Sequence, residues 1–246
     1  MKLIALIPHY NHAATIGQVV EAMVGMGVDC LIVDDGSDEA AKKVVTQLLK
    51  DGVQVIFRAT NGGKGAAVKD GIKYAGDQGY THVLQIDADA QHCLNDCEKL
   101  ITLAQQHPQS VICARPVYGA DAPKSRLYGR KISNFWLVIN TLSFDIKDGM
   151  CGFRIYPLSL TAVVVHQDRL GNYMDFDTEI LVRLHRRGAD FVWVDTPVSY
   201  ADNGVSHFRA WQDNVLISKM HARLFADMLC HVPQIILAKR QRDRNG

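Results

Sequence analysis

Residues 3–37 read LIALIPHYNHAATIGQVVEAMVGMGVDCLIVDDGS and contain the pattern of a strand, a helix and a second strand. The apolar runs at residues 3–7 and 30–33 have the length of buried strands. Between them, residues 15–26 repeat apolar side chains at the spacing of one helix face. A helix that connects two strands in this way predicts a pair of parallel strands in one sheet.

The same alternation continues through the first half of the chain. Further strand-length runs lie at residues 53–57, 82–86 and 111–114, and helical patterns lie at 40–50, 66–76 and 95–106. This order predicts the α/β class, with a Rossmann-like, mostly parallel central sheet and helices on both faces. Since ligands of such sheets bind beyond the carboxyl ends of the strands, the residues that follow each strand form the candidate site.

The second half is less regular. It predicts a polar loop over residues 116–125, helices over 127–142 and 177–187, a turn-rich segment over 148–157, and strands at 191–194 and 198–200. A long amphipathic helix begins near residue 210 and ends in a basic tail.

Composition excludes several classes of function. The 246 residues are 48% hydrophobic and 22% charged with a formal net charge of +1, which argues against a nucleic-acid-binding protein. We expect no membrane-spanning helix, because no apolar stretch reaches roughly 18 residues, and no signal peptide. The six cysteines lack paired spacings, which is typical of reduced thiols in a cytoplasmic protein. Cys93 and Cys97 lie near His92, but no second pair follows at a zinc-site spacing.

Polar motifs follow the second and third predicted strands. Asp34 and Asp35 could accept hydrogen bonds from a ribose or a base, or could cap the next helix. The loop at residues 62–65, Gly-Gly-Lys-Gly, could approach a phosphate or form a glycine turn before a helix. It is not a Walker A loop, because neither serine nor threonine follows Lys64.

A third motif follows the fourth predicted strand. Asp87, Asp89 and Gln91 present oxygen atoms at alternate positions, which suits a hard divalent cation such as Mg²⁺ or Mn²⁺. The segment lacks the glycine and the distal glutamate of an EF-hand, so a calcium loop is not expected.

The order of these motifs resembles the family-2 glycosyltransferases of the GT-A fold. In chain order the motifs are Pro8-x-Tyr10-Asn11, Val33-Asp34-Asp35-Gly36-Ser37, Asn61-Gly62-Gly63-Lys64-Gly65 and Asp87-Ala88-Asp89. Residues 148–154, DGMCGFR, are similar to a segment of dolichol-phosphate mannose synthase-like members. The resemblance implies one GT-A domain over residues 1–246: a nucleotide-sugar-binding half at 1–115, an acceptor-binding half at 116–210, and an amphipathic helix with a basic tail at 211–246.

The resemblance also implies the donor site. Nucleotide contacts would come from Pro8, Tyr10, Asn11, Asp34, Asp35, Lys64, Asp87 and Ala88. Asp89 would be the principal ligand of Mg²⁺ or Mn²⁺, and the further ligands would be Asp87, Gln91 and His207. The cation would neutralise the charge on the departing nucleoside diphosphate. Family members use UDP or GDP donors, and no residue here separates the two.

Inverting members of the family carry a carboxylate base in a Glu-Asp pair at the start of a helix. Asp177 occupies the base position, although Phe176 replaces the glutamate, and Glu179 is the alternative base. These carboxylates, with Asp175, could instead simply favour the positive N-terminus of the helix.

Cations and hydroxyls suited to an acceptor or a phosphate follow in the second half. The candidates are Arg126, Arg130, Ser133, Arg154 and Arg209. The basic run at 126–131 could also be a solvated helix face. His207 and Arg209 stand where relatives have a loop that closes over the donor phosphates. A catalytic base suits a hydroxyl acceptor and the cations suit a lipid phosphate, so both acceptors remain open.

The C-terminal helix could lie on an anionic membrane surface, or pack on the core with a solvated basic tail. The sequence thus predicts an inverting, metal-dependent glycosyltransferase of the hexosyltransferase type. It would move a sugar from a UDP- or GDP-linked donor to a lipid or other membrane-associated acceptor, in cell-envelope or glycolipid synthesis. We expect it in the cytoplasm, peripheral at the cytoplasmic face of the inner membrane.

Two other functions compete with this prediction. A nucleotidyltransferase would need a glycine-rich basic loop after the first strand, which residues 8–15 do not supply. A catalytically silent nucleotide-sugar-binding or scaffolding subunit would not need the intact Asp-x-Asp motif or the carboxylate at position 177.

Overall fold

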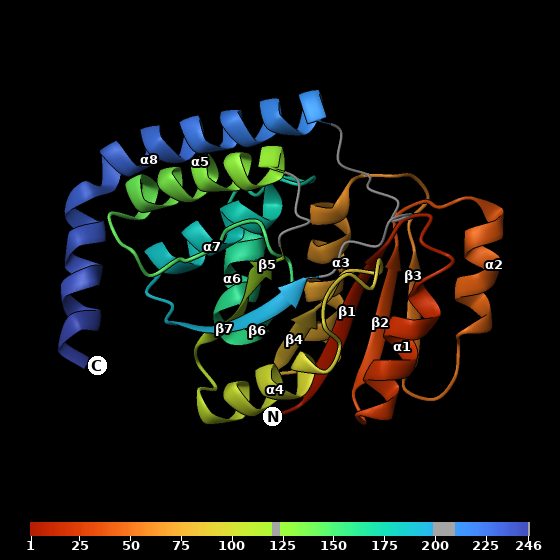
Figure 1. Ribbon diagram of the computed structural model, residues 1–246. Coiled ribbons are helices and arrows are strands. Elements are labelled where there is room, and N and C mark those ends of the chain that lie inside the picture. The colour runs from red at the N-terminus through yellow and green to blue at the C-terminus, as the bar shows by residue number, and fades with distance from the viewer. Residues whose placement is uncertain (120–123, 199–209, 246) are drawn as a thin grey trace.

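The apolar runs pair into one mixed sheet of seven strands, in the order β3-β2-β1-β4-β6-β5-β7 (Figure 1). The computed structural model describes residues 1–119, 124–198 and 210–245, without the side chains of 124–126, 210, 231 and 234–245. The strands are β1 Leu3–His9, β2 Asp29–Asp34, β3 Val53–Phe57, β4 His82–Gln85, β5 Val111–Tyr118, β6 Arg154–Pro157 and β7 Phe191–Val198. All neighbouring strands are parallel except β6, which runs antiparallel to β4 and β5.

Helices cover both faces of this sheet. Successive side chains of β1 alternate between two apolar cores, with Ile4 and Leu6 in one and Ala5 and Ile7 in the other. The first core contains side chains of α3 Lys64–Asp77, α5 Lys124–Thr141, α6 Leu158–Gln167, α7 Phe176–Arg186 and α8 Ala210–Asn245. The second contains side chains of α1 Ile16–Gly25, α2 Glu39–Gln47 and α4 Asp96–Gln106. The predicted fold class is therefore confirmed.

Two expectations about the second half were wrong. Residues 154–157 form β6 within the predicted turn-rich segment, because insertion between β4 and β5 gives this short segment strand partners on both sides. The strands expected at 191–194 and 198–200 are one continuous strand as far as the description reaches, since β7 pairs with β5 from Phe191 to Val198. Pro197 is tolerated because β7 is an edge strand.

The topology places the carboxyl ends of β1 and β4 side by side at the centre of the sheet. From β1 the chain continues outward to β2 and β3, and it then returns across the sheet to β4 on the other side of β1. Such a switch point is where α/β sheets bind ligands. The turn after β2 meets the loop after β3 closely here. A Cβ at Gly36, whose φ is +73°, would lie 2.7 Å from the backbone nitrogen of Asn61.

The six cysteines are free thiols. Burial raises the pKa of Cys30, Cys97, Cys113 and Cys151 to about 12, so these thiols stay protonated. Among the described helices, none combines the length and the apolar content that crossing a bilayer requires.

Candidate active site

A cavity of about 1090 Å³ opens at the carboxyl ends of β1 and β4. Its walls come from both halves of the chain: the turn after β1, the start of α3, the loop after β4, residues 150–152, and the helices α5, α7 and α8. The predicted site residues that line it are Pro8, Tyr10, Asp35, Lys64, Asp87, Ala88, Asp89, Gln91, Arg130, Ser133 and Asp177.

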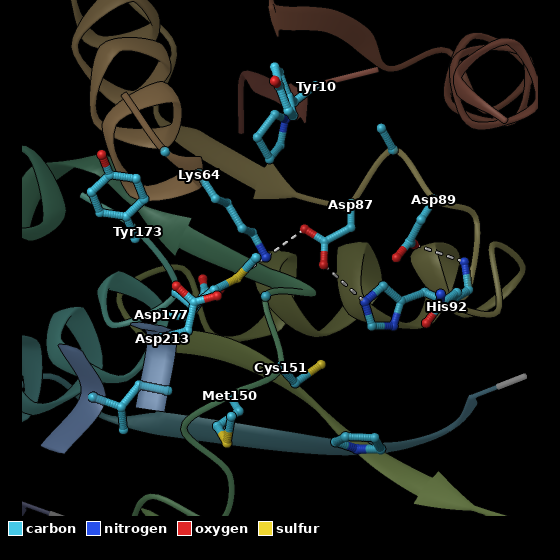
Figure 2. A pocket seen from close by; sticks show the side chains of 18 of the residues that line it. Tyr10, Lys64, Asp87, Asp89, His92, Met150, Cys151, Tyr173, Asp177 and Asp213 are labelled. Atoms are coloured by element: carbon cyan, nitrogen blue, oxygen red, sulfur yellow. Dashed lines mark hydrogen bonds and ion pairs between the residues drawn. The ribbon is translucent and has the colours of Figure 1, made fainter. Parts of the chain in front are cut away.

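Lys64 connects the two halves of the cavity (Figure 2). Its Nζ lies 2.6 Å from Asp87 Oδ1 and 2.9 Å from Asp177 Oδ2. Lys64 begins α3, Asp177 lies in the first turn of α7, and Asp87 follows β4. Burial alone would lower the pKa of Lys64, but the carboxylates of Asp177 and Asp87 outweigh it and raise that pKa. The ammonium group is therefore a fixed positive charge between two carboxylates.

Buried polar groups hold Asp177 in place. Its carboxylate accepts a hydrogen bond of 2.8 Å from Gln85 Nε2, and its backbone carbonyl accepts one of 2.5 Å from Arg154 Nη1. Arg154 also donates to the carbonyl of Gly149 at 2.9 Å. Because Arg154 is fully buried and does not line the cavity, it supports Asp177 from behind and is not placed as the predicted acceptor contact. Sequence analysis missed Gln85, whose signal is an amide within an apolar strand.

Glu179 faces away from the cavity lining. Its Oε2 accepts hydrogen bonds from the backbone nitrogen of Gly171 at 2.9 Å and from Arg223 Nη2 at 2.6 Å. It is fully buried in this network. Of the two candidate bases, Asp177 lines the cavity and Glu179 does not.

The Asp-x-Asp segment has the electrostatics of a cation site. Burial would raise the pKa of Asp87, but Lys64 and His92 hold it well below its usual range. Burial and then the Asp87 charge raise the pKa of Asp89, which the backbone N–H of Gln91 only partly offsets through a 3.1 Å hydrogen bond. A bound divalent cation would relieve this repulsion between neighbouring carboxylates.

The protein ligands suit a cation whose coordination shell is completed by the substrate. No group of three His, Cys, Asp or Glu side chains converges on a metal position within the described ranges. Mg²⁺ needs fewer protein ligands, because it binds through one or two carboxylates together with water and substrate phosphates. Asp87, Asp89 and Gln91, which line one cavity, fit that requirement. The predicted ligand His207 lies outside the described residues.

The predicted nucleotide residues divide into lining and supporting groups. Asp35 accepts hydrogen bonds from the backbone nitrogens of Gly62 at 2.9 Å and Gly63 at 2.7 Å, so it holds the glycine loop against the cavity. Asp34 is fully buried and pairs with His9 Nδ1 at 2.8 Å.

Asn11 does not line the cavity. Its side-chain oxygen accepts a hydrogen bond of 2.9 Å from the backbone nitrogen of Asp38. Asn11 therefore ties the turn after β1, which carries Tyr10, to the start of α2.

The opposite end of the cavity is formed by α5 and α8. Arg130 Nε lies 3.2 Å from Asp148 Oδ2, and Arg130 also donates to the Tyr118 hydroxyl. Ser133 follows one turn later on α5. The further lining residues Leu127, Met174, Asp213, Asn214 and Ile217 were not predicted from the sequence, whereas Met150 lies in the motif at residues 148–154. The side chain of Arg126 and all of Arg209 lie outside the described residues.

Comparisons with known proteins identify relatives of this chain. The sequence model of glycosyl transferase family 2 matches residues 4–164. An uncharacterized protein of Methanocaldococcus jannaschii is 29% identical over 218 residues, which cover 83% of this chain and 91% of that protein. The undecaprenyl-phosphate mannosyltransferase of Micrococcus luteus is 25% identical over 250 residues, which cover 98% of this chain and 96% of that enzyme.

A third relative and a solved structure extend the comparison. The polyprenol monophosphomannose synthase of Mycolicibacterium smegmatis is 27% identical over 163 residues, covering 63% of this chain and 61% of that enzyme. The crystal structure of glucosyl-3-phosphoglycerate synthase from Mycobacterium tuberculosis superposes with a TM-score of 0.69 at 14% identity, covering 92% of this chain and 80% of that one. The family match spans well over half of the sequence, and the chain therefore belongs to glycosyl transferase family 2 as a glycosyltransferase of the GT-A fold.

Proposed function

We propose that this glycosyltransferase moves a sugar from a UDP- or GDP-linked donor to a lipid phosphate, with inversion at the anomeric carbon and with a bound Mg²⁺ or Mn²⁺. The observation that carries the proposal is the meeting of Lys64, Asp87 and Asp177 in one cavity. That cavity has the turns predicted to bind the nucleotide at one end and Arg130 with Ser133 at the other.

Departure of the nucleoside diphosphate needs positive charge at the donor end. As the acceptor oxygen bonds to the anomeric carbon, the bond to the diphosphate breaks and its electron pair leaves with the phosphate. Lys64 is a fixed cation that can exchange a carboxylate partner for a phosphate oxygen. A divalent cation held by Asp89 and Asp87, with Gln91, would supply Lewis-acid stabilisation of the leaving group.

Asp177 stands on the acceptor side of Lys64. A hydroxyl acceptor would give its proton to this carboxylate as the new bond forms. A phosphate monoester is already anionic near neutral pH, so with that acceptor Asp177 would hold Lys64 and orient the sugar. The position of Asp177 on the attacking side suits a one-step displacement, and such a displacement inverts the anomeric carbon.

Two independent observations support this acceptor class. Four of the relatives have names that describe transfer to or synthesis of polyprenol, dolichyl or undecaprenyl phosphates. In this chain, Arg130 and Ser133 offer a cation and a hydroxyl for a phosphate, beside the apolar side chains of Leu127 and Ile217. We therefore favour a lipid phosphate over a free hydroxyl.

We also propose peripheral contact with an anionic membrane at its cytoplasmic face. Helix α5 has four Lys or Arg residues and no Asp or Glu, and it exposes Tyr128, Ile132 and Phe135. Trp211 is exposed in the first turn of α8, the helix named for this contact on sequence grounds. Six free thiols suit a reducing compartment such as the cytoplasm.

A transfer assay tests the proposal. Purified protein in detergent would receive UDP- or GDP-hexose, a polyprenyl phosphate or the corresponding polyprenol, and Mn²⁺, Mg²⁺ or EDTA. We expect product only with the phosphorylated lipid and a divalent cation, and with the opposite anomeric configuration to the donor. Asp177→Asn, which removes the carboxylate that holds Lys64 and orients the sugar, and Asp89→Asn, which removes a cation ligand, should each lose at least about 100-fold in rate. Asp51→Asn, at an exposed carboxylate after α2, should not change the rate.

Other outcomes would point elsewhere. A retained anomeric configuration would exclude the one-step displacement, and full activity in EDTA would exclude the cation. Nucleotide binding without transfer or donor hydrolysis would favour the silent nucleotide-sugar-binding subunit. Release of pyrophosphate from a nucleoside triphosphate would favour the nucleotidyltransferase.

A further inference from the structure

A buried polar trio lies between α5 and α8, which run side by side (Figure 1). His221 Nε2 on α8 is 3.1 Å from Ser133 Oγ on α5, and His221 Nδ1 is 3.2 Å from Asn140 Nδ2 on α5. The three residues are at most 4% exposed. Ser133 alone of the three also lines the cavity. A chain of hydrogen bonds therefore runs from the helix interface to the acceptor end of the site.

The imidazole is neutral in this position. Its ring stacks on Trp136, with centroids 6.3 Å apart and planes 29° apart. Burial lowers the pKa of His221 to about 4, so the ring carries no charge near pH 7. A neutral imidazole has one N–H donor and one acceptor nitrogen. Which nitrogen donates is decided by its partners.

The orientation of the Asn140 amide assigns the tautomer. The amide nitrogen, which is only a donor, is turned toward Nδ1 of His221, and in that orientation Nδ1 accepts from Asn140 Nδ2. The ring proton is then on Nε2, which donates to Ser133 Oγ. A serine oxygen that accepts this bond keeps its own proton for a different partner. Because Ser133 lines the cavity, that partner would be a ligand there.

We propose that His221 is a positioning residue that directs the Ser133 hydroxyl proton into the cavity, where it binds an anionic oxygen of the acceptor. Arg130 lies one helical turn earlier on α5 and lines the same cavity, so it supplies the matching positive charge. The proposal rests on the proposed phosphate acceptor. It adds that the orientation of one hydroxyl is set from α8, 88 residues away in sequence.

Nitrogen-15 NMR of histidine-labelled protein tests the tautomer without any substitution. We expect His221 to show a protonated Nε2 and an unprotonated Nδ1 near pH 7. A protonated Nδ1 would overturn the proposal, because Nε2 would then accept the serine proton. Asn140→Asp should impose that reversed tautomer, since a carboxylate only accepts.

Ligand binding tests whether the oriented Ser133 hydroxyl binds an anionic oxygen in the cavity. The probes are farnesyl phosphate and inorganic phosphate, with UDP and GDP as references for the donor end. Three substitutions should each weaken the binding of both phosphate probes about tenfold and leave nucleotide affinity unchanged: His221→Leu, Asn140→Asp and Ser133→Ala. His221→Gln should bind the probes like the wild type, because its amide N–H can replace Nε2–H.

A double substitution separates positioning from simple packing. If His221 acts through Ser133, Ser133→Ala with His221→Leu should bind the probes no more weakly than Ser133→Ala alone. A further loss in the double variant would mean a structural role and would overturn the proposal. Equal binding by wild type and His221→Leu would overturn it while leaving the phosphate acceptor intact. A wild type that bound neither phosphate probe would overturn both.

Discussion

Lys64 decides the charge balance of the site at the scale of single residues. The carboxylates of the half-buried Asp87 and the buried Asp177 lie within 3 Å of its Nζ, and they face one cavity from the loop after β4 and from α7. The sequence predicted that Lys64 lies near the nucleobase or a phosphate of the donor. It could not show that this lysine reaches Asp177, the candidate catalytic base. The contact joins residues 113 positions apart, and only the packing of α3 against α7 creates it.

Replacement of Lys64 by methionine should therefore reduce both stability and activity. The buried Asp177 and the half-buried Asp87 would lose their counter-charge, at a cost of about 3 kcal/mol in the free energy of unfolding at pH 7.5. The pKa of Asp87, which Lys64 holds low, would rise, so the loss should shrink at pH 4.5, where protonation removes the repulsion. Transfer should fall by about 100-fold or more, because the leaving phosphate loses a cation.

Urea unfolding at the two pH values, with initial rates, measures these effects. The control is Lys73→Met, at an exposed lysine on the same helix. Equal stability losses at pH 4.5 and 7.5 would contradict the electrostatic explanation.

Close approach of α3 and α7 sets the site at the scale of elements. A Cβ at Gly65 would lie 2.4 Å from Phe176 Cβ and 2.9 Å from the carbonyl oxygen of Gly171. Neither atom can move without shifting backbone. Gly76, near the end of the same helix, would have open space around an added Cβ.

The same substitution should thus have opposite effects at the two ends of α3. Gly65→Ala should destabilise by about 1–3 kcal/mol through overpacking. It should also lower the transfer rate, since it separates Lys64 from Asp177. Gly76→Ala should stabilise by about 0.5–1 kcal/mol, because alanine loses less backbone entropy than glycine in a helix. The denaturant midpoints of the two variants measure these changes in stability. Destabilisation by both substitutions would contradict the explanation that α3 and α7 approach closely only at Gly65.

The interface of α5 and α8 gives a prediction about pH. The pKa of His221 is about 4 in the folded chain and about 6.5 in the unfolded chain. The unfolded state therefore takes up more protons as the pH falls from 6.5 towards 4, and this histidine makes folding less favourable over that range. The loss amounts to up to about 3 kcal/mol. His221→Gln should lose less stability than the wild type between pH 7 and 4.5 in urea unfolding, and parallel losses would contradict this assignment.

What the sequence could predict depended on how local the signal was. The strands and helices of the first half follow from their own periodicity, and so does α7. Strand β6 did not, because its four residues are buried only by insertion between two strands that are remote in sequence. Similarly, Asp87 and Asp177 were found from motifs, whereas Gln85, His221 and Asp213 enter the site through tertiary contacts that leave no spacing pattern.

At the scale of the whole molecule, the acceptor end of the cavity and the most apolar surface belong to the same two helices. Most of the exposed large apolar side chains of the described residues lie on α5, in the loop after it and on α8: Tyr128, Ile132, Phe135, Leu142, Phe144, Trp211 and Leu229. Tyr128, Ile132 and Phe135 share one face of α5, since they are four and three residues apart. A lipid acceptor must reach Arg130 and Ser133 from a bilayer, and contact through this face would bring the cavity to it.

The double substitution Ile132→Ser with Phe135→Ser should therefore weaken binding to vesicles of phosphatidylcholine with phosphatidylglycerol. Partial burial of each side chain at about 1 kcal/mol gives roughly a 30-fold loss. Binding of the wild type should also fall with added salt, because α5 is basic. UDP or GDP affinity in solution should stay unchanged, which shows that the fold is intact. Leu49→Ser, at an apolar side chain exposed just after α2, is the matched control and should bind vesicles like the wild type. Vesicle sedimentation measures the effect, and equal binding by both variants would exclude α5 as the contact. A wild-type dimer that the double substitution converts to a monomer would instead make this face a contact between two copies of the chain.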